Sequence, residues 1–184
     1  MRRSAPWLAL CLCLCPVLLA AGDSGVWLDV PFVKQEKNAC GAASVAMVMQ
    51  YWQRQLGQPA AADAGEIERA LYAREAHGIY ASDLQGYLKE HGYRTFAFQG
   101  TWEDLQEQLE KGRPLIVALK TGRDNFHYVV VAGLDRRQNM LLKNDPAERK
   151  LLKQSRAGFE KEWKAAANWT LLAVPQQDGR ASLR

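Results

Sequence analysis

The chain reads Gln35-Glu-Lys-Asn-Ala-Cys40-Gly41-Ala-Ala-Ser44 at the point where a polar loop gives way to an apolar run. That run continues to Trp52 with alanine, valine and methionine at spacings that predict a largely buried helix over residues 41–52. A helix N-terminus offers unpaired backbone N–H groups and the positive end of the helix dipole, and both stabilise a thiolate. Cys40 is therefore a candidate nucleophile. Gly41 is a candidate substrate-binding residue, because a glycine lets a substrate backbone come close.

The other three cysteines lie in an apolar stretch, residues 5–21, that follows Arg2 and Arg3. A basic start followed by a short apolar run is typical of a secretory signal peptide. We expect cleavage near Gly22-Asp23, which removes residues 1–22, leaves no integral membrane span and exports the chain to the periplasm or out of the cell. Cys40 is then the one cysteine of the mature chain and cannot form an internal disulfide. A free thiol in an oxidising compartment favours catalysis, and the alternative is an inert, buried cysteine.

The net charge and the length of the chain bear on nucleic-acid binding and on the number of domains. The chain has 24 basic and 20 acidic residues, and loss of Arg2 and Arg3 leaves 22 against 20, a net charge of +2 with the two signs well mixed. This balance gives no support to a role in binding nucleic acid. The mature length suits one domain, expected over residues 23–175, with a frayed tail at residues 176–184.

Helical patterns dominate the first half of the chain and strand patterns the second. This order predicts an α+β fold in two layers, with a helical half packed on an antiparallel sheet. Capping signals at Ser82-x-x-Gln85 and Thr101-x-x-Asp104 predict where two of the helices begin. The predicted helices span residues 41–52, 66–73, 82–91, 101–111 and 159–167, and the predicted strands span residues 93–98, 114–119, 127–133, 140–143 and 169–174.

Two polar residues flank the predicted turn at residues 135–139. His127 begins the strand before it, and Asp145 follows the strand after it. If these strands pair antiparallel, the start of the first lies beside the end of the second, and the imidazole meets the carboxylate. A histidine oriented by a carboxylate can take the proton of a thiol. Gln35 can donate its amide to the developing oxyanion, beside the backbone N–H of Cys40.

Each of these residues also has an ordinary structural explanation. A histidine at a strand edge is commonly structural, Asn-Asp-Pro is a common turn signal, and Gln35 alone is a polar loop residue. His77 and His91 fall in a predicted loop and at a predicted helix end, and we leave both out of the site. No cysteine or histidine spacing indicates a metal site, and the glycines form no phosphate-binding loop. Four aromatic residues near predicted loops and strand starts are candidates to line a substrate groove, and they are Tyr80, Trp102, Phe126 and Tyr128.

Taken together and in order, these motifs resemble papain-like cysteine peptidases of the bacteriocin-processing, double-glycine-leader type, especially their stand-alone exported relatives. The resemblance covers Val30-Pro31-Phe32 before Gln35, Cys40-Gly41-Ala42-Ala43, His127-Tyr128-Val129-Val130, Asn144-Asp145-Pro146 and the Phe159-to-Trp163 segment. It implies a papain-like fold with Cys40 as nucleophile, His127 as general base and acid, Asp145 as the residue that orients it, and Gln35 as the oxyanion donor.

The resulting expectation is a peptidase that needs no cofactor and acts on a peptide or protein substrate through a thioester. Two other classes stay open. One is a peptide-binding module on the same scaffold that has no catalytic activity, and the other is a thiol amidase or acyltransferase that uses the same three residues. Analysis of products separates a hydrolase from an acyltransferase, because hydrolysis releases a carboxylate and transfer forms a new amide. The sequence does not indicate an oligomeric state.

Overall fold

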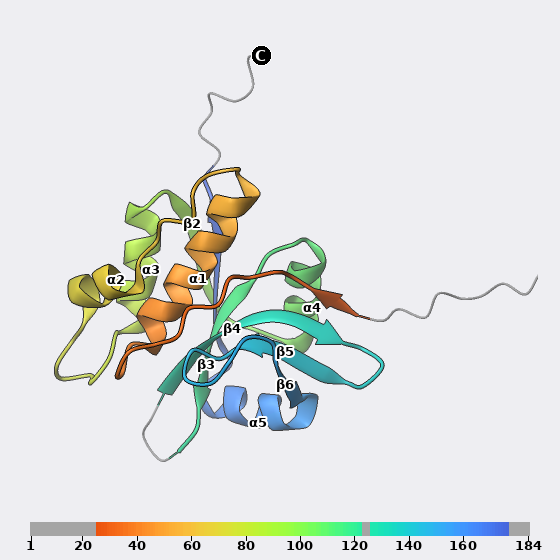
Figure 1. Ribbon diagram of the computed structural model, residues 1–184. Coiled ribbons are helices and arrows are strands. Elements are labelled where there is room, and N and C mark those ends of the chain that lie inside the picture. The colour runs from red at the N-terminus through yellow and green to blue at the C-terminus, as the bar shows by residue number, and fades with distance from the viewer. Residues whose placement is uncertain (1–24, 123–125, 177–184) are drawn as a thin grey trace, which may run out of the picture.

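A seven-stranded antiparallel sheet forms the centre of the computed structural model, which describes residues 25–122 and 126–176 (Figure 1). Six strands lie in the order β2-β7-β3-β4-β5-β6, and β1 pairs with the end of β4 beyond the reach of β3. The predicted signal peptide, residues 1–22, and nearly all of the predicted tail fall outside these residues. The strands are β1 (Val26–Trp27), β2 (Tyr93–Gln99), β3 (Leu115–Lys120), β4 (Phe126–Asp135), β5 (Met140–Asn144), β6 (Leu152–Ser155) and β7 (Trp169–Pro175).

Helices cover both faces of the sheet. Figure 1 shows α1, α2 and α3 together on one side and α5 on the opposite side. One buried cluster joins the α1 to α3 side to alternate residues of β3 and β4, and a second cluster joins α4 and α5 to the residues in between. The helices are α1 (Cys40–Gln55), α2 (Ala64–Leu71), α3 (Ala81–Glu90), α4 (Trp102–Glu110) and α5 (Arg156–Ala165).

The α+β class and the antiparallel sheet are as predicted, but the prediction of two layers is wrong. The central strands are apolar on both faces, because nearly every residue of β3 and β4 is buried. A strand with one wetted face would alternate between apolar and polar residues, whereas the run from Leu115 to Leu119 does not. Both faces therefore need a covering layer, and α4 and α5 supply the third.

Three of the five helices, α2, α4 and α5, begin at a residue whose side chain caps the helix. Thr101 and Asp104 form the predicted capping box, in which the hydroxyl of Thr101 accepts from the N–H of Asp104 and the Asp104 carboxylate accepts from the N–H of Thr101. The capping box predicted at Ser82 is wrong: α3 begins at Ala81, Tyr80 is its N-cap, and the Ser82 hydroxyl donates to Asp83.

Two short strands escaped prediction. β1 has two residues, and β6 reads Leu-Lys-Gln-Ser with no apolar alternation. Gly133 allows β1 to lie close to β4, because a Cβ atom at this position would lie 2.6 Å from the carbonyl oxygen of Val26 and 2.8 Å from Cβ of Trp27. Only a residue without a side chain permits this approach of one backbone to another.

The pairing of β4 with β5 brings the proposed histidine and carboxylate to one edge of the sheet. The two strands run antiparallel through the predicted turn, with Val130 opposite Asn144 and Asp135 opposite Met140. The start of β4 therefore lies beside the loop that follows β5, as the sequence predicted. The N-terminus of α1 reaches the same edge, because α1 packs across β4.

Candidate active site

Cys40 is the first residue of α1, and its side chain is partly exposed. Ala39 is the N-cap and supplies no side-chain acceptor, and the first turn holds no acidic residue. The N–H groups at this end of the helix are consequently not occupied by a cap, and no carboxylate in the first turn opposes a negative charge on the sulfur. The local sequence thus presents a thiol at an electrically favourable helix end.

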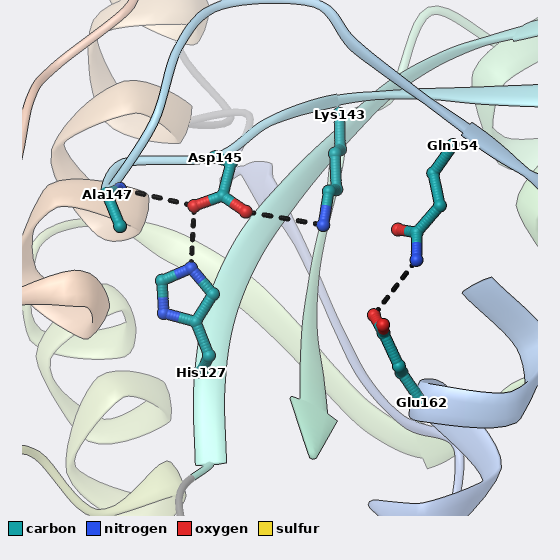
Figure 2. A network of polar contacts seen from close by, with 6 residues as sticks. All are labelled: His127, Lys143, Asp145, Ala147, Gln154 and Glu162. Carbon is teal, nitrogen blue, oxygen red and sulfur yellow. Dashed lines mark hydrogen bonds and ion pairs between the residues drawn. The ribbon is translucent and has the colours of Figure 1, made fainter. Parts of the chain in front are cut away.

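His127 lies next to Asp145, with 2.6 Å between its Nε2 and Oδ1 of the carboxylate (Figure 2). The side chain of Asp145 is 4% exposed and that of His127 is 17% exposed. The side chain of Cys40 also interacts with the imidazole, and this interaction raises the pKa of His127. Because Nε2 is engaged by Asp145, the other ring nitrogen, Nδ1, is the one available to the sulfur. One imidazole therefore links the thiol to the carboxylate.

The turn after β5 fixes the Asp145 carboxylate. Its Oδ1 accepts from the backbone N–H of Ala147 at 3.2 Å as well as from His127. The backbone of Asp145 is held at both ends, since its N–H donates to the Arg149 carbonyl and its carbonyl accepts from Glu148. The Asn-Asp-Pro turn thus reverses the chain and also orients one carboxylate oxygen of Asp145 toward the histidine.

The charges of the site reinforce one another. Burial lowers the pKa of the His127 imidazole, but hydrogen bonds and charge interactions with Asp145 and Cys40 outweigh burial and raise this pKa to about 9. Burial raises the pKa of the Asp145 carboxyl, but the interactions with His127 and Lys143 are stronger and hold it below its ordinary value. The arrangement therefore favours an imidazolium beside the Asp145 carboxylate at neutral pH.

Gln35 lines the same cavity as Cys40. Its backbone N–H donates to the carbonyl of Pro146 at 3.0 Å, which ties the segment before α1 to the Asp145 turn. The carboxamide oxygen is buried and has no hydrogen-bond partner within residues 25–122 and 126–176. The side chain is therefore not anchored through its oxygen, and its NH₂ group is the part that could donate to an oxyanion.

A cavity of about 890 Å³ opens over these residues and is lined by Gln35, Cys40, His127 and Asp145. Of the four aromatic candidates, Tyr80, Phe126 and Tyr128 line it and Trp102 does not. Tyr80 is 49% exposed and Phe126 is 57% exposed, so both present apolar surface at the cavity mouth. His77, which the sequence does not place in the site, also lines this cavity, whereas His91 stacks on Tyr87 and does not line it.

The two candidate substrate-binding residues are mainly buried. The Tyr128 ring packs edge-on against Trp169 with 5.6 Å between centroids, and burial together with the nearby Cys40 and Asp83 raises the pKa of its hydroxyl to about 12. A side chain at Gly41 would meet Leu84 at 3.1 Å and Tyr128 at 3.4 Å. The absence of a side chain at Gly41 thus lets α1 pack closely against its neighbours, and Gly41 does not line the cavity.

Sequence reasoning missed two residues of this site, Lys143 and Asn144. Both are at least 95% buried, and they directly precede Asp145 at the end of an otherwise apolar strand. A lysine and an asparagine inside Met-Leu-Leu-Lys-Asn were the available signal, because alternation on a buried strand places both side chains in the interior. Lys143 is ion-paired with Asp145, and Asn144 binds the segment that leads to Gln35.

Within residues 25–122 and 126–176, no three histidine, cysteine, aspartate or glutamate side chains are grouped so that they could hold a metal ion. No helix in these ranges has the length and apolar character needed to cross a membrane.

Several solved structures similar to this one are peptidases or peptidase domains. A putative C39-like peptidase from Bacillus anthracis superimposes with a TM-score of 0.68 at 19% identity, covering 85% of this chain and 100% of its own. The peptidase domain of Streptococcus ComA, a bifunctional ABC transporter involved in quorum sensing, gives 0.64 at 23% identity, covering 80% and 99%. A double glycine motif protease from an AMS/PCAT transporter, solved with a leader peptide, gives 0.65 at 20% identity, covering 82% and 95%.

At these sequence identities the similarity shows the fold alone, and that fold is the one of papain-like peptidases. A search of curated proteins finds no match. The sequence itself matches the family model described as the Peptidase_C39 like family over residues 27–170, a range that includes Cys40, His127 and Asp145. Because this match spans most of the chain, the protein belongs to the Peptidase_C39 like family.

Proposed function

We propose that this protein is an exported cysteine peptidase that hydrolyses peptide bonds through Cys40, His127 and Asp145. The observation that carries the proposal is one partly buried imidazole that lies 2.6 Å from Asp145 and interacts with Cys40, in the wall of an open cavity. Family and fold are those of peptidases, which supports a peptide as the substrate.

The proposed reaction has two steps. The Cys40 thiolate attacks the carbonyl carbon of a peptide bond, a C–S bond forms, and the C–N bond breaks as the His127 imidazolium gives its proton to the leaving amine. Water then attacks the thioester while neutral His127 takes one of its protons. The C–S bond breaks, the acyl group leaves as a carboxylic acid that gives its remaining proton to solvent, and the thiolate and imidazolium are restored. No cofactor enters either step.

Two donors support stabilisation of the oxyanion that forms in each step. The backbone N–H of Cys40 is at the uncapped start of α1, and Gln35 lines the same cavity as Cys40. Donors that are in place before charge develops stabilise a transition state more than its ground state. Gln35→Ala is therefore expected to lower kcat by about a hundredfold and to leave the rate of Cys40 alkylation within a fewfold of wild type.

The substrate is proposed to be a peptide or protein outside the cytoplasm. The basic start and apolar stretch of residues 1–22 support export. The exposed rings of Tyr80 and Phe126 at the cavity mouth support a substrate with apolar side chains near the cleaved bond. Expression of the full chain in a bacterial host, followed by fractionation and N-terminal sequencing, tests export, and an unprocessed chain retained in the cytoplasm would contradict it.

The decisive experiment for the chemistry compares wild type and Cys40→Ala on a mixture of peptides, with products identified by mass spectrometry in H₂¹⁸O. Wild type is expected to release new carboxylates that carry ¹⁸O, and Cys40→Ala to release none while its circular dichroism and Tm stay unchanged. Cleavage by Cys40→Ala would refute the proposal. A new amide in place of a carboxylate would identify an acyltransferase, and binding without turnover by wild type would identify a peptide-binding module.

A further inference from the structure

Lys143 is a charged side chain in the interior. It is the fourth residue of β5, and its side chain is 6% exposed. Burying an ammonium group is costly unless an opposite charge and hydrogen bonds compensate for the lost water. A buried lysine therefore needs an anionic partner. The proposed peptidase reaction gives Lys143 no role.

The partner is the carboxylate of Asp145. Alternation along β5 puts Lys143 on the same face as Leu141, which packs in the α5-side core. At the end of the strand the long side chain reaches Oδ2 of Asp145, with 3.2 Å between Nζ and the oxygen (Figure 2). Figure 2 shows Lys143 and His127 on different oxygens of one carboxylate, so that Asp145 is held from two directions.

The two oxygens of this carboxylate have unequal support. Oδ1 accepts from His127 and from the Ala147 N–H, whereas Lys143 is the one donor to Oδ2 found among residues 25–122 and 126–176. If the ammonium were lost, a buried oxygen would be left unpaired. The carboxylate would then turn to seek another donor or take up a proton, and either change would weaken its hold on His127.

We propose that Lys143 is a positioning residue of the Cys40, His127 and Asp145 site, whose ammonium group fixes Oδ2 of Asp145 and thereby aims Oδ1 at Nε2 of His127. This inference rests on the proposed function. It makes the site a relay of four side chains in which the charges alternate from thiolate to imidazolium to carboxylate to ammonium. Lys143 touches no reacting atom and acts through Asp145.

Two other charged groups of this cavity, Glu162 and Lys153, have partners other than Asp145. Glu162 of α5 accepts from the Gln154 amide at 2.9 Å, and Lys153 of β6 contacts Asp135 at 3.2 Å. Both line the same cavity, as does Glu148, which follows the Asp145 turn. Of the lysines and arginines in the described ranges, Lys143 is the one ion-paired with Asp145. Among the neighbouring groups, its substitution should therefore act chiefly on this carboxylate.

The test measures iodoacetamide alkylation of Cys40 across pH in the full chain, because this reaction reports the thiolate without a substrate. Trypsin cleaves after Lys37 and Arg54, so the Cys40 peptide is separated from Cys11, Cys13 and Cys15. In Lys143→Met, the acidic midpoint of labelling should rise by about one to two pH units, which is about a tenfold or greater loss of rate at a fixed acidic pH. Lys143→Arg keeps a cation and should restore most of the shift.

Lys150→Met is the matched control. Lys150 lies in the loop after Asp145 and forms an ion pair with Asp29, but it does not line the cavity. Its labelling profile should match wild type. A double-mutant cycle covers the case in which Lys143→Met unfolds: Lys143→Met/Asp145→Asn buries no unpaired charge, and its profile should lie within about twofold of Asp145→Asn alone.

Each outcome bears on a different claim. A Lys143→Met profile that overlays wild type, while wild-type labelling still depends on His127, would overturn the role of Lys143 and leave the three-residue site standing. Wild-type labelling that is unchanged by His127→Ala would overturn both proposals. A further large shift on adding Lys143→Met to Asp145→Asn would mean that Lys143 does not act through Asp145, which also overturns the inference.

Discussion

Asn144 provides the sharpest test of how the fold holds the site. Its side chain is fully buried, and its amide donates to the carbonyls of Val30 and Pro31 at 3.1 and 3.2 Å. Its oxygen accepts from the N–H of Leu151 at 2.9 Å. One side chain therefore joins the extended segment before α1 to the loop after β5, and these two segments carry Gln35 and Asp145.

Asn144→Ala removes three hydrogen bonds and leaves three backbone groups in the interior without their partner. At about 1 kcal/mol for each bond, with part of the cost of stranding buried groups added, the free energy of unfolding should fall by about 3 to 5 kcal/mol. That is a large share of the stability of an ordinary domain, about 5 to 15 kcal/mol. Gln138→Ala, an exposed change in the β4–β5 turn, should cost less than about 0.5 kcal/mol.

Asn144→Asp tests the direction of the bonds. The introduced carboxylate still accepts from Leu151 but faces the oxygens of Val30 and Pro31. Burial and these oxygens raise the pKa of the introduced carboxyl, so its protonated form, which can donate, predominates at low pH. The variant should be less stable than Asn144→Ala at pH 7 and should recover part of that deficit at pH 5. Urea unfolding at both pH values measures this, and a cost of Asn144→Ala below about 1 kcal/mol would refute the reasoning.

Three further substitutions test the site and the sheet. Asp145→Asn removes the charge that holds the imidazolium and should lower kcat by on the order of 10³-fold or more, but less completely than Cys40→Ala, and a rate equal to wild type would exclude the orienting role. His127→Gln tests the raised pKa of about 9, because the stabilisation of the fold by the imidazolium is complete below pH 6.5 and is lost as pH rises through 9. Across that range the free energy of unfolding of wild type should fall by up to about 3 kcal/mol, and that of the variant should not show this fall. Urea titrations at several pH values measure the difference. Gly133→Ala should push β1 from β4 and lower the free energy of unfolding by about 1 to 3 kcal/mol, and a Tm unchanged from wild type would contradict the close approach seen there.

The sequence predicted the parts of this structure that depend on local rules. The strands on either side of the turn at residues 135–139 had to pair antiparallel, so the placement of His127 beside Asp145 followed from the length of the turn and the ends of the strands. The capping box at Thr101 followed from two residues three apart. Ser82 shows the limit of that rule, because the same spacing occurs inside the first turn of α3, where Tyr80 already ends the preceding loop.

What the sequence could not supply are contacts between distant segments. Nothing near Asn144 indicates that its amide binds residues more than a hundred positions earlier, and nothing near Gln35 indicates that its N–H meets the Pro146 carbonyl. The third layer was missed for a different reason. A run such as Leu115 to Leu119 is apolar in every position, and this pattern alone does not say which segments cover the second face of the strand.

Strand alternation explains why three consecutive buried polar residues can serve one site. Lys143 points to the α5 face of β5 and reaches Asp145 from that side, whereas Asn144 points to the α1 face and holds the segment that carries Gln35. Asp145, at the point where the strand ends, is free of the pleat and turns to His127. Slipping the register of β5 by one residue would exchange the two faces and separate all three from their partners. The pairing of β5 with β4 therefore fixes the position of the carboxylate and of both groups that support the site, which is why substitutions at Lys143 and Asn144 should affect the chemistry of Cys40 without touching it.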